Sequence, residues 1–360
     1  MIMNSRIVWR ALSNKTADGY GYASRKISSG LKTSGLDILR PEDIVFSGKE
    51  KTLLVCISPE GEYFEVPYAE FSDKDILINN CLPVDYELKA GYNIGFSYWE
   101  TNRLPANWVD RLNSCQEIWT TSKWAKSVFE DSTGHTNVRS FNLGIDSDNF
   151  WASDKVSDGP FTFLHVGSPS TRKNSQMAFD AFIKTFGSKK DYRLLIKSVG
   201  PTDARWKTES MNHGSVSNHD RVLVIDEEVD DRTLGDLYRS AHCLVYPTSG
   251  EGWGMIPFNA IGCGLPTICT NGTACEEYAN LSVPLDFKWG TQGQFGIYNN
   301  CGEWAVPDFD DLCDKMIWVA NNYQDIKQTT YNSAKIIHKE YSWDVSVSAY
   351  KDRLCQILNL

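Results

Sequence analysis

The feature that most constrains this fold is an alternation of short apolar runs with segments of helical periodicity. Parallel strands need crossover connections, usually helices, so the alternation predicts parallel α/β sheets. The chain has 360 residues, enough for two ordinary domains with a core in each. The predicted strands are residues 6–11, 52–57, 75–79, 93–98 and 117–120 in the first half, and 161–166, 193–197, 221–225, 243–246 and 267–270 in the second.

A polar segment, residues 146–160, separates the two series, and its Asp, Ser and Gly content is typical of a linker. We therefore expect one doubly wound domain at residues 1–150 and another at 151–342, facing each other across a cleft. In the closing segment, residues 343–360, a helix at about 345–358 is a candidate for crossing back to the first domain. The other predicted helices are residues 22–34, 176–186, 233–240 and 257–261.

Charge and the start of the chain limit the classes of function. The formal net charge of −10 at pH 7 disfavours a broad electrostatic grip on nucleic acid or on an anionic membrane. Arg6 and Arg10 interrupt the N-terminal apolar residues, so no signal peptide is predicted. No apolar run reaches the roughly 18 residues of a transmembrane helix. We expect a cytoplasmic protein, and no pattern specifies its oligomeric state.

Candidate metal ligands do not form a recognisable site. Among the ten cysteines, Cys263, Cys269 and Cys275 are evenly spaced, but the spacing matches no zinc pattern, and reduced buried thiols are the better interpretation. Two Asp-x-Asp tripeptides, residues 146–148 and 308–310, could hold a divalent cation, yet neither follows a phosphate-binding glycine turn. The sequence therefore predicts no metal and no cofactor.

The most informative stretch is residues 249–260, which follows a predicted strand and leads into a helix. Gly250, Gly252 and Gly254 let the backbone approach a ligand closely. The helix that follows offers unpaired N–H groups and a positive dipole end, which suit a diphosphate. Glu251 can accept hydrogen bonds from sugar hydroxyls. The alternative is a glycine-rich turn with a solvated glutamate.

A second stretch, residues 165–174, has a similar position after a strand. Gly167 ends the strand, and Arg172 and Lys173 stand before the next helix. Arginine can make forked contacts to phosphate and lysine a point contact. Taken alone, the pair is better explained as two solvated basic residues before a helix.

Together, the two stretches indicate a family. Residues 161–186 and 221–278, which contain them, resemble the nucleotide-sugar domain of the family 4 retaining glycosyltransferases, the glycosyl transferases group 1 of GT-B fold. That family carries a Glu, seven residues and a second Glu, and a Gly followed by a basic pair. Residues 95–105, 119–124 and 142–146 resemble further segments of it. The similarity runs from about residue 94 to the C-terminus, and the GT-B fold it implies has two Rossmann-like domains.

The resemblance implies roles for individual residues. Glu251 would hold the donor sugar, and Lys173 with Arg172 the diphosphate, as the catalytic set. Asn259 stands where the family has its second Glu, and Ser168 where it usually has Arg. This chain has no His before His135, so a family histidine near the donor sugar is missing, and Glu100 is a candidate replacement. The other implied donor contacts are Gly167, Glu228, Val229, Gly252, Trp253, Gly254 and Met255, and the acceptor-side residues are Gly19, Gly21, Trp99, Glu100 and Asn102.

The resemblance implies a metal-independent, retaining transfer of a sugar from a nucleotide-diphosphate donor to a glycan or small-molecule acceptor. Asn259 and the missing histidine leave open a catalytically weak nucleotide-sugar-binding protein. Modified DNA is a further alternative acceptor, which the net charge disfavours. A redox Rossmann protein is disfavoured because no Gly-x-Gly-x-x-Gly follows a strand.

Overall fold

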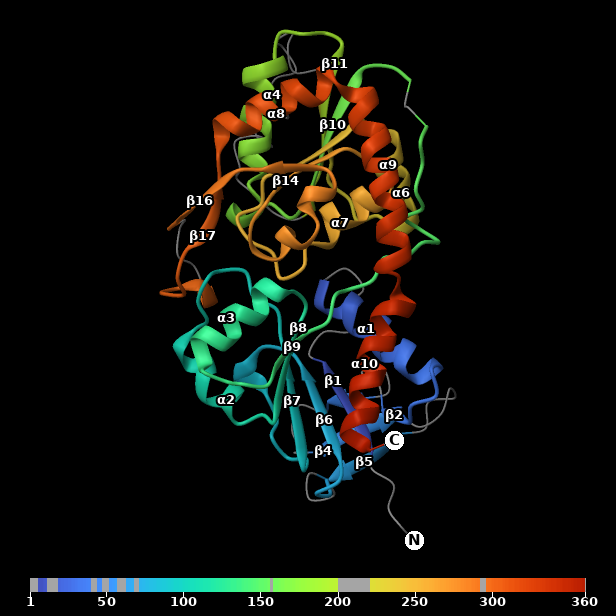
Figure 1. The fold of residues 1–360 in the computed structure, drawn as a ribbon, viewed down its shortest axis with the longest axis vertical. Helices are drawn as coiled ribbons and strands as arrows, with labels where there is room; N and C mark the ends of the chain where they lie inside the picture. Colours follow the sequence, from blue (N-terminus) through green and yellow to red (C-terminus); the bar gives the residue numbers. More distant parts are fainter. Residues whose placement is uncertain are drawn as a thin grey trace. The chain divides into compact units, whose positions relative to one another are not determined.

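The computed structural model describes residues 6–11, 19–39, 44–46, 52–56, 63–67, 71–155, 158–199, 221–291 and 296–359. The chain divides into two compact units (Figure 1). Unit 1 comprises Met1–Trp99, Arg103–Gly144 and Trp343–Leu360, and unit 2 comprises Glu100–Asn102 and Ile145–Ser342. The closing helix is thus part of unit 1, and the chain passes between the units at Gly144 and again before Trp343.

Unit 1 is built on a six-stranded parallel sheet in the order β2-β1-β6-β7-β8-β9. The strand order reverses between β1 and β6, because β2 pairs with one edge of β1 and β6 with the other. In open α/β sheets such a switch point is where ligands bind, beyond the carboxyl ends of the strands. The strands are β1 (Ile7–Ala11), β2 (Ile38–Leu39), β6 (Ile76–Asn80), β7 (Tyr92–Phe96), β8 (Glu117–Thr120) and β9 (Val138–Ser140).

Two helices distant in sequence pack side by side on this sheet, α1 (Gly19–Thr33) and α10 (Trp343–Leu358) (Figure 1). Gly30 lets them approach, since a Cβ there would lie 2.6 Å from Val347 Cγ2. Tyr350 of α10 packs its ring against Phe96 and Trp119 of the sheet. Two further helices are α2 (Val109–Asn113) and α3 (Lys123–Thr133).

A buried carboxylate also ties α10 to the sheet. Glu117, on β8, is fully buried and accepts from Arg353 Nη2 at 2.8 Å, from Trp119 Nε1 at 2.9 Å and from Tyr92 OH at 3.2 Å. Arg139 forms a second ion pair with it. Removing one partner of such a buried pair leaves an uncompensated charge, which is costly.

Glu117→Ala is therefore expected to destabilise unit 1 by about 3 kcal/mol, because two arginines lose their buried partner. Urea unfolding followed by circular dichroism measures the change. Glu130→Ala is the matched control, since Glu130 pairs with Lys126 on the exposed face of α3 and should contribute under about 0.5 kcal/mol. Equal losses of unfolding free energy in the two variants would show that the buried Glu117 network stabilises the protein no more than an exposed ion pair does.

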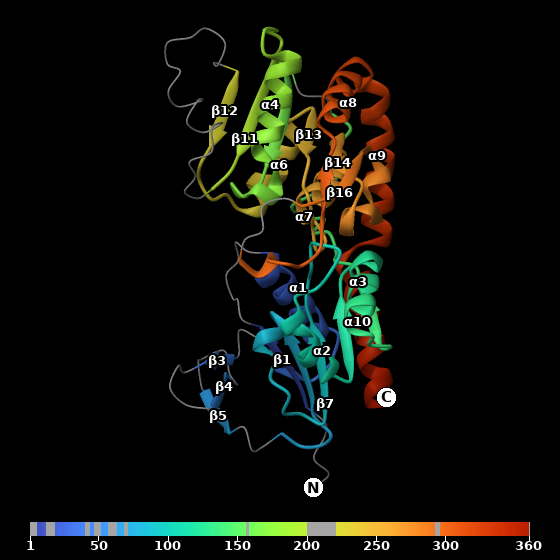
Figure 2. The ribbon, with the colours of Figure 1, turned by 90° about the vertical axis from the view of Figure 1, so that its left-hand side faces the viewer.

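Unit 2 has its own six-stranded parallel sheet, in the order β12-β11-β10-β13-β14-β15. Helices α4 and α8 pack against each other, and α7 packs against α9 (Figure 2). The strands are β10 (Phe161–Val166), β11 (Tyr192–Lys197), β12 (Val222–Ile225), β13 (Cys243–Tyr246), β14 (Thr267–Thr270) and β15 (Val283–Leu285). The helices are α4 (Ser175–Phe186), α6 (Asp231–Ser240), α7 (Met255–Gly262), α8 (Phe309–Asn321) and α9 (Tyr323–Glu340), and an antiparallel hairpin joins β16 (Phe287–Gly290) to β17 (Trp304–Pro307).

The prediction of parallel sheets is confirmed for both units, but one strand was assigned wrongly. The predicted strand at 52–57 appears as β4 (Thr52–Cys56), with residue 57 outside the described part. It does not join the parallel sheet. It pairs antiparallel with β3 (Ile44–Phe46) and β5 (Tyr63–Pro67), which Figure 2 shows as a sheet of their own. An apolar run specifies a strand but not the direction of its neighbours.

The aspartates of both Asp-x-Asp segments accept hydrogen bonds from nearby backbone N–H groups. Asp308 caps α8 by accepting from the N–H groups of Asp310 and Asp311, and Asp146 accepts from Asp148 N at 3.2 Å. In the described ranges, no group of three His, Cys, Asp or Glu residues could hold a metal ion. The cysteines from Cys81 onward are all free thiols. Within the same ranges, no helix is both long and apolar enough to cross a membrane.

Candidate functional site

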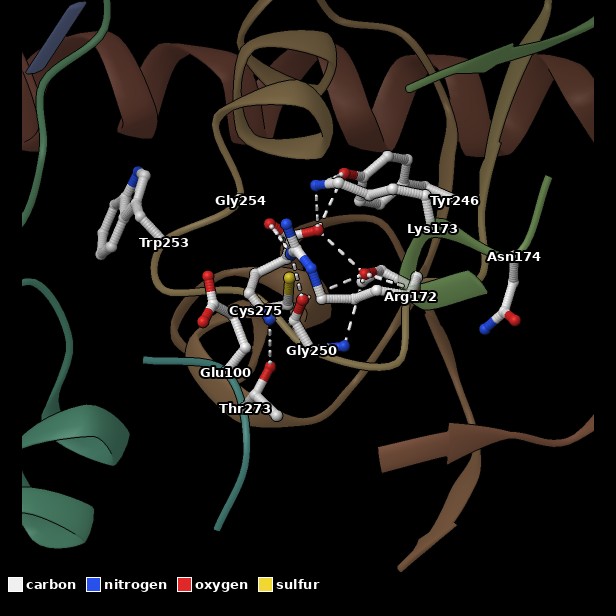
Figure 3. A network of polar contacts seen from close by, with 12 residues as sticks. Glu100, Arg172, Lys173, Asn174, Tyr246, Gly250, Trp253, Gly254, Thr273 and Cys275 are labelled. Carbon is white, nitrogen blue, oxygen red and sulfur yellow. Dashed lines mark hydrogen bonds and ion pairs between the residues drawn. The ribbon is translucent and has the colours of Figure 1, made fainter. Parts of the chain in front are cut away.

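The candidate site lies in unit 2, at the carboxyl ends of the neighbouring strands β10 and β13. Arg172 and Lys173 belong to a 3-10 turn, η5 (Thr171–Lys173), that follows β10. Glu251 belongs to the glycine-rich loop between β13 and α7. Figure 3 shows Arg172 and Lys173 of the first segment beside Gly250 of the second, and both basic side chains form ion pairs with Glu251. Because the strands are adjacent and parallel, residues 78 apart in sequence meet at one edge of the sheet.

Glu251 is the centre of a polar network. Its side chain is buried, and its Oε1 accepts from Lys173 Nζ at 2.6 Å, from Thr248 Oγ1 at 2.8 Å and from Tyr246 OH at 2.9 Å. Its Oε2 lies 3.2 Å from Arg172 Nη1. Lys173 also donates to Tyr246 OH at 2.7 Å, and Arg172 donates to Gly250 O at 2.6 Å. Both cations are therefore held by one carboxylate.

The backbone around the network is tied across the two segments. Ser249 N donates to Arg172 O at 2.8 Å, and Glu251 N donates to Thr273 Oγ1 at 3.0 Å. Asn174 adopts a left-handed conformation, with φ 52°, and its Nδ2 donates to Pro247 O at 2.8 Å and to Ser249 Oγ at 2.7 Å. These bonds fix the positions from which Arg172 and Lys173 project.

The protonation states follow from burial and from the neighbouring charges. Burial raises the pKa of the Glu251 carboxyl, but the charges of Lys173 and Arg172, with hydrogen bonds from Lys173 and Thr248, outweigh it and bring that pKa to about 2. Burial and the charge of Arg172 lower the pKa of Lys173. Burial disfavours the charged form of Arg172 as well, yet the Glu251 carboxylate raises its pKa. The cluster thus carries two cations against one carboxylate at its centre.

The glycines keep the loop close to its surroundings. A Cβ at Gly250 would lie 2.2 Å from the backbone oxygen of Glu100. Gly254 has φ 85°, and a Cβ there would lie 2.4 Å from Tyr278 OH. Gly254 is the N-cap of α7, and a Cβ there would also lie 3.2 Å from Glu251 Cγ, so this helix begins close to Glu251. Together, the two basic side chains and the N-terminus of α7 are suited to binding an anion.

Several predicted donor contacts lie at or beside this network. A Cβ at Gly167 would lie 3.5 Å from Lys173 Cβ, and Gly252 is buried in the loop. Ser168 is exposed after β10, and Asn259 is buried in α7.

Other predicted donor contacts do not join the network of side chains around Glu251. Trp253 is buried against Phe258 and Tyr278, and its side chain lies apart from the network in Figure 3, so a donor contact at this residue would involve its backbone. Glu228 and Val229 follow β12, which β11 separates from β10, and they lie outside the network.

The predicted acceptor-side residues are divided between the units. Gly19 and Gly21 form the first turn of α1 in unit 1. Trp99 was wrongly predicted to face an acceptor: its side chain is fully buried, its ring centroid is 4.7 Å from that of Trp108, and its Nε1 donates to Arg103 O at 2.9 Å.

Glu100 and Asn102 instead belong to unit 2. Glu100 Oε2 accepts from Tyr298 OH at 3.0 Å. Asn102 exchanges two hydrogen bonds with Glu303, from Asn102 N to Glu303 O and from Glu303 N to Asn102 Oδ1. Because Glu100 also contacts Gly250 through its backbone, it lies beside the donor loop. Tyr246 and Thr248, which complete the network, were missed because a strand-end tyrosine and a loop threonine carry no motif.

The comparison with protein families identifies the class. The sequence model described as "Family 4 Glycosyltransferase in conflict systems" matches residues 120–349. The chain belongs to this family. The resemblance inferred from residues 161–186 and 221–278 is therefore confirmed, and the protein is a glycosyltransferase.

Curated relatives agree with this class. The O-antigen chain mannosyltransferase B of Escherichia coli is 28% identical over 117 residues, which are 32% of this chain and 29% of that protein. An uncharacterized glycosyltransferase of Methanocaldococcus jannaschii is 22% identical over 232 residues, 64% of this chain and 57% of that protein. The chain thus covers less than two thirds of the length of either relative.

Solved structures show the fold of this glycosyltransferase. Sucrose-phosphate synthase from Thermosynechococcus elongatus aligns with a TM-score of 0.69 at 12% identity, over 99% of this chain and 100% of that one. Anabaena HepE, solved in complex with UDP and glucose, aligns with a TM-score of 0.65 at 11% identity, over 98% and 100%. The chain has the GT-B fold, with two Rossmann-like domains.

Proposed function

We propose that this glycosyltransferase transfers a hexosyl group from a nucleotide-diphosphate donor to a hydroxyl of a glycan or other small-molecule acceptor, with retention of configuration and without a metal ion. The observation that supports it best is the pair Arg172 and Lys173 beside the start of α7, where a diphosphate fits. The solved structure of HepE with UDP and glucose and the mannosyltransferase named among the relatives favour a hexosyl donor of this kind.

The two cations would act on the leaving group. Negative charge develops on the diphosphate as the bond to the sugar breaks, and fixed positive groups stabilise that charge without rearranging. Lys173 and Arg172 are held by Glu251 and by backbone bonds in the free protein, so they are positioned before the donor arrives. They would supply the positive charge that a metal ion supplies in metal-dependent transferases.

Glu251 would hold the donor sugar. With its pKa at about 2 it stays ionised at neutral pH, so its oxygens can accept from sugar hydroxyls. In the proposed step the acceptor oxygen attacks the anomeric carbon from the side of the departing diphosphate. The bond from that carbon to the diphosphate oxygen breaks, the bond to the acceptor oxygen forms, and the acceptor proton passes to the diphosphate. Configuration is retained because attack and departure share one face.

A thermal-shift panel tests the donor assignment. We expect one nucleotide-diphosphate sugar to raise the melting temperature in the presence of EDTA, because a ligand at 100 times its Kd stabilises by about 2.7 kcal/mol. Glu251→Ala should reduce this stabilisation. If no nucleotide or nucleotide sugar raises the melting temperature, the donor site is wrongly assigned. Stabilisation without product, assayed against a panel of glycosides, would instead indicate a nucleotide-sugar-binding protein.

A further inference from the structure

Strand β6 of unit 1 ends with two adjacent asparagines, and their side-chain amides differ in hydrogen bonding. Asn79 and Asn80 are both buried, at 0% and 1% exposure. The Asn79 amide is paired: its Nδ2 donates to Glu87 O at 2.8 Å, and its Oδ1 accepts from Glu87 N at 3.0 Å. Among the residues that the structure describes, the Asn80 amide has a hydrogen-bond partner at neither Nδ2 nor Oδ1. Leaving a buried polar group unpaired is unfavourable, so such a group calls for an explanation.

Asn80 occupies the switch point of the sheet. It is the last residue of β6, and its register partners are Ala11, the last residue of β1, and Phe96, the last of β7. The strand order reverses between β1 and β6, and the carboxyl ends of the strands at such a point are where ligands bind. The unpaired amide is therefore at the sheet position most suited to a ligand.

The start of α1 borders the same place. Register partners in a parallel sheet share a face, and residues two apart on a strand do so too, so Asn80 lies on the face of Trp9, whose Nε1 donates to Ser24 of α1 at 2.8 Å. Tyr20, in the first turn of α1, has its hydroxyl 3.2 Å from Ser97 Oγ, just beyond the end of β7. The Asn80 side chain thus lies on the face of the sheet that α1 covers, near the turn that carries Gly19 and Gly21.

We propose that Asn80 binds hydroxyl groups of the glycosyl acceptor, a role that rests on the proposed transfer of a sugar. A primary amide offers one acceptor oxygen and two donor hydrogens on neighbouring atoms, which complements a pair of vicinal sugar hydroxyls. The stability lost in the free protein is recovered when the acceptor pairs with the amide. Asn80 is then a specificity-determining residue of unit 1, distinct from the donor network around Glu251.

The experiment compares Asn80→Ala with Asn79→Ala. Methyl α-mannoside, methyl α-glucoside and methyl α-galactoside are the probes, and saturation-transfer NMR titration measures their affinity. For Asn80→Ala we expect the affinity for the bound glycoside to fall at least about tenfold. Its melting temperature should stay unchanged or rise by about 2 °C, because an unpaired group is removed. Asn79→Ala should lower the melting temperature by about 3–6 °C and keep the affinity, because it loses the hydrogen bonds that this amide forms with Glu87 and Arg10.

The outcomes separate this proposal from the donor assignment. The Asn80 proposal is overturned if Asn80→Ala destabilises the protein as much as Asn79→Ala, if it leaves glycoside affinity unchanged, or if the unaltered protein binds none of the three probes. Stabilisation by a nucleotide sugar is measured on the same variants and should not change. If glycosides bind but no nucleotide sugar does, the donor assignment fails and the Asn80 subsite stands.

Discussion

Replacing Lys173 by Met is expected to lower kcat for sugar transfer by about 10²–10³-fold, the usual loss when one preorganised group that stabilises the leaving charge is removed. Methionine keeps an apolar stem of similar length and removes the charge. The Lys173 ammonium is the closest cation to Glu251, at 2.6 Å, and its side chain is only 11% exposed. Because the ammonium is so little exposed to water, its charge would act on the diphosphate with little solvent screening. Steady-state kinetics of product formation measures the loss.

Lys184→Met is the matched control for this prediction. Lys184 lies on α4 of the same unit, and its exposed side chain pairs with the exposed Asp310. Exposed ion pairs contribute little, so kcat should stay within about twofold. If the Lys173→Met variant keeps both its turnover and its melting temperature, Lys173 does not bind the diphosphate.

The sequence was sufficient for five of the six parallel strands of unit 2, because each of them is an apolar run bounded by a glycine or a polar turn. The short strand β15 was not predicted. The runs at 161–166, 243–246 and 267–270 coincide with β10, β13 and β14. The same logic placed Arg172, Lys173 and Glu251 at one sheet edge, where the structure brings them within 3.2 Å or less. Residues whose role depends only on their position after a strand are therefore predictable.

The predictions that failed concern residues whose positions depend on tertiary packing, which a sequence pattern does not specify. Trp99 and Trp253 stand in motif segments, yet both rings are buried, because a large apolar side chain gains more from a core than from a wet site. Glu100 follows a unit 1 strand but lies with unit 2, since its partners Gly250 and Tyr298 are about 150 and 200 residues away in sequence. Asn80 had no signal at all: only the structure distinguishes it from the paired Asn79.

Replacing Glu251 by Gln should have opposite effects on product binding and on transfer. Lys173 and Arg172 are both held by the carboxylate in the free protein, so a diphosphate competes with it for the two cations. The amide removes that competition, and affinity for the nucleoside diphosphate product should rise by about tenfold. Transfer should fall by about 10²–10³-fold, because a neutral amide holds the sugar hydroxyls less strongly than a carboxylate. Isothermal titration and product formation measure the two quantities, with Glu130→Gln on α3 as the neutral control.

The same substitution predicts a change in the dependence of stability on pH. The Glu251 carboxyl has a pKa of about 2 in the folded protein against an ordinary 4.5, so ionisation favours the folded state. The stabilisation, at most about 3 kcal/mol, is complete above pH 4.5 and is lost as the pH falls towards 2. The Gln variant lacks this titration, so between pH 4.5 and 2 its free energy of unfolding should fall less steeply than that of the unaltered protein. Parallel curves, together with unchanged affinity for the nucleoside diphosphate, would mean that Glu251 does not hold the two cations in solution.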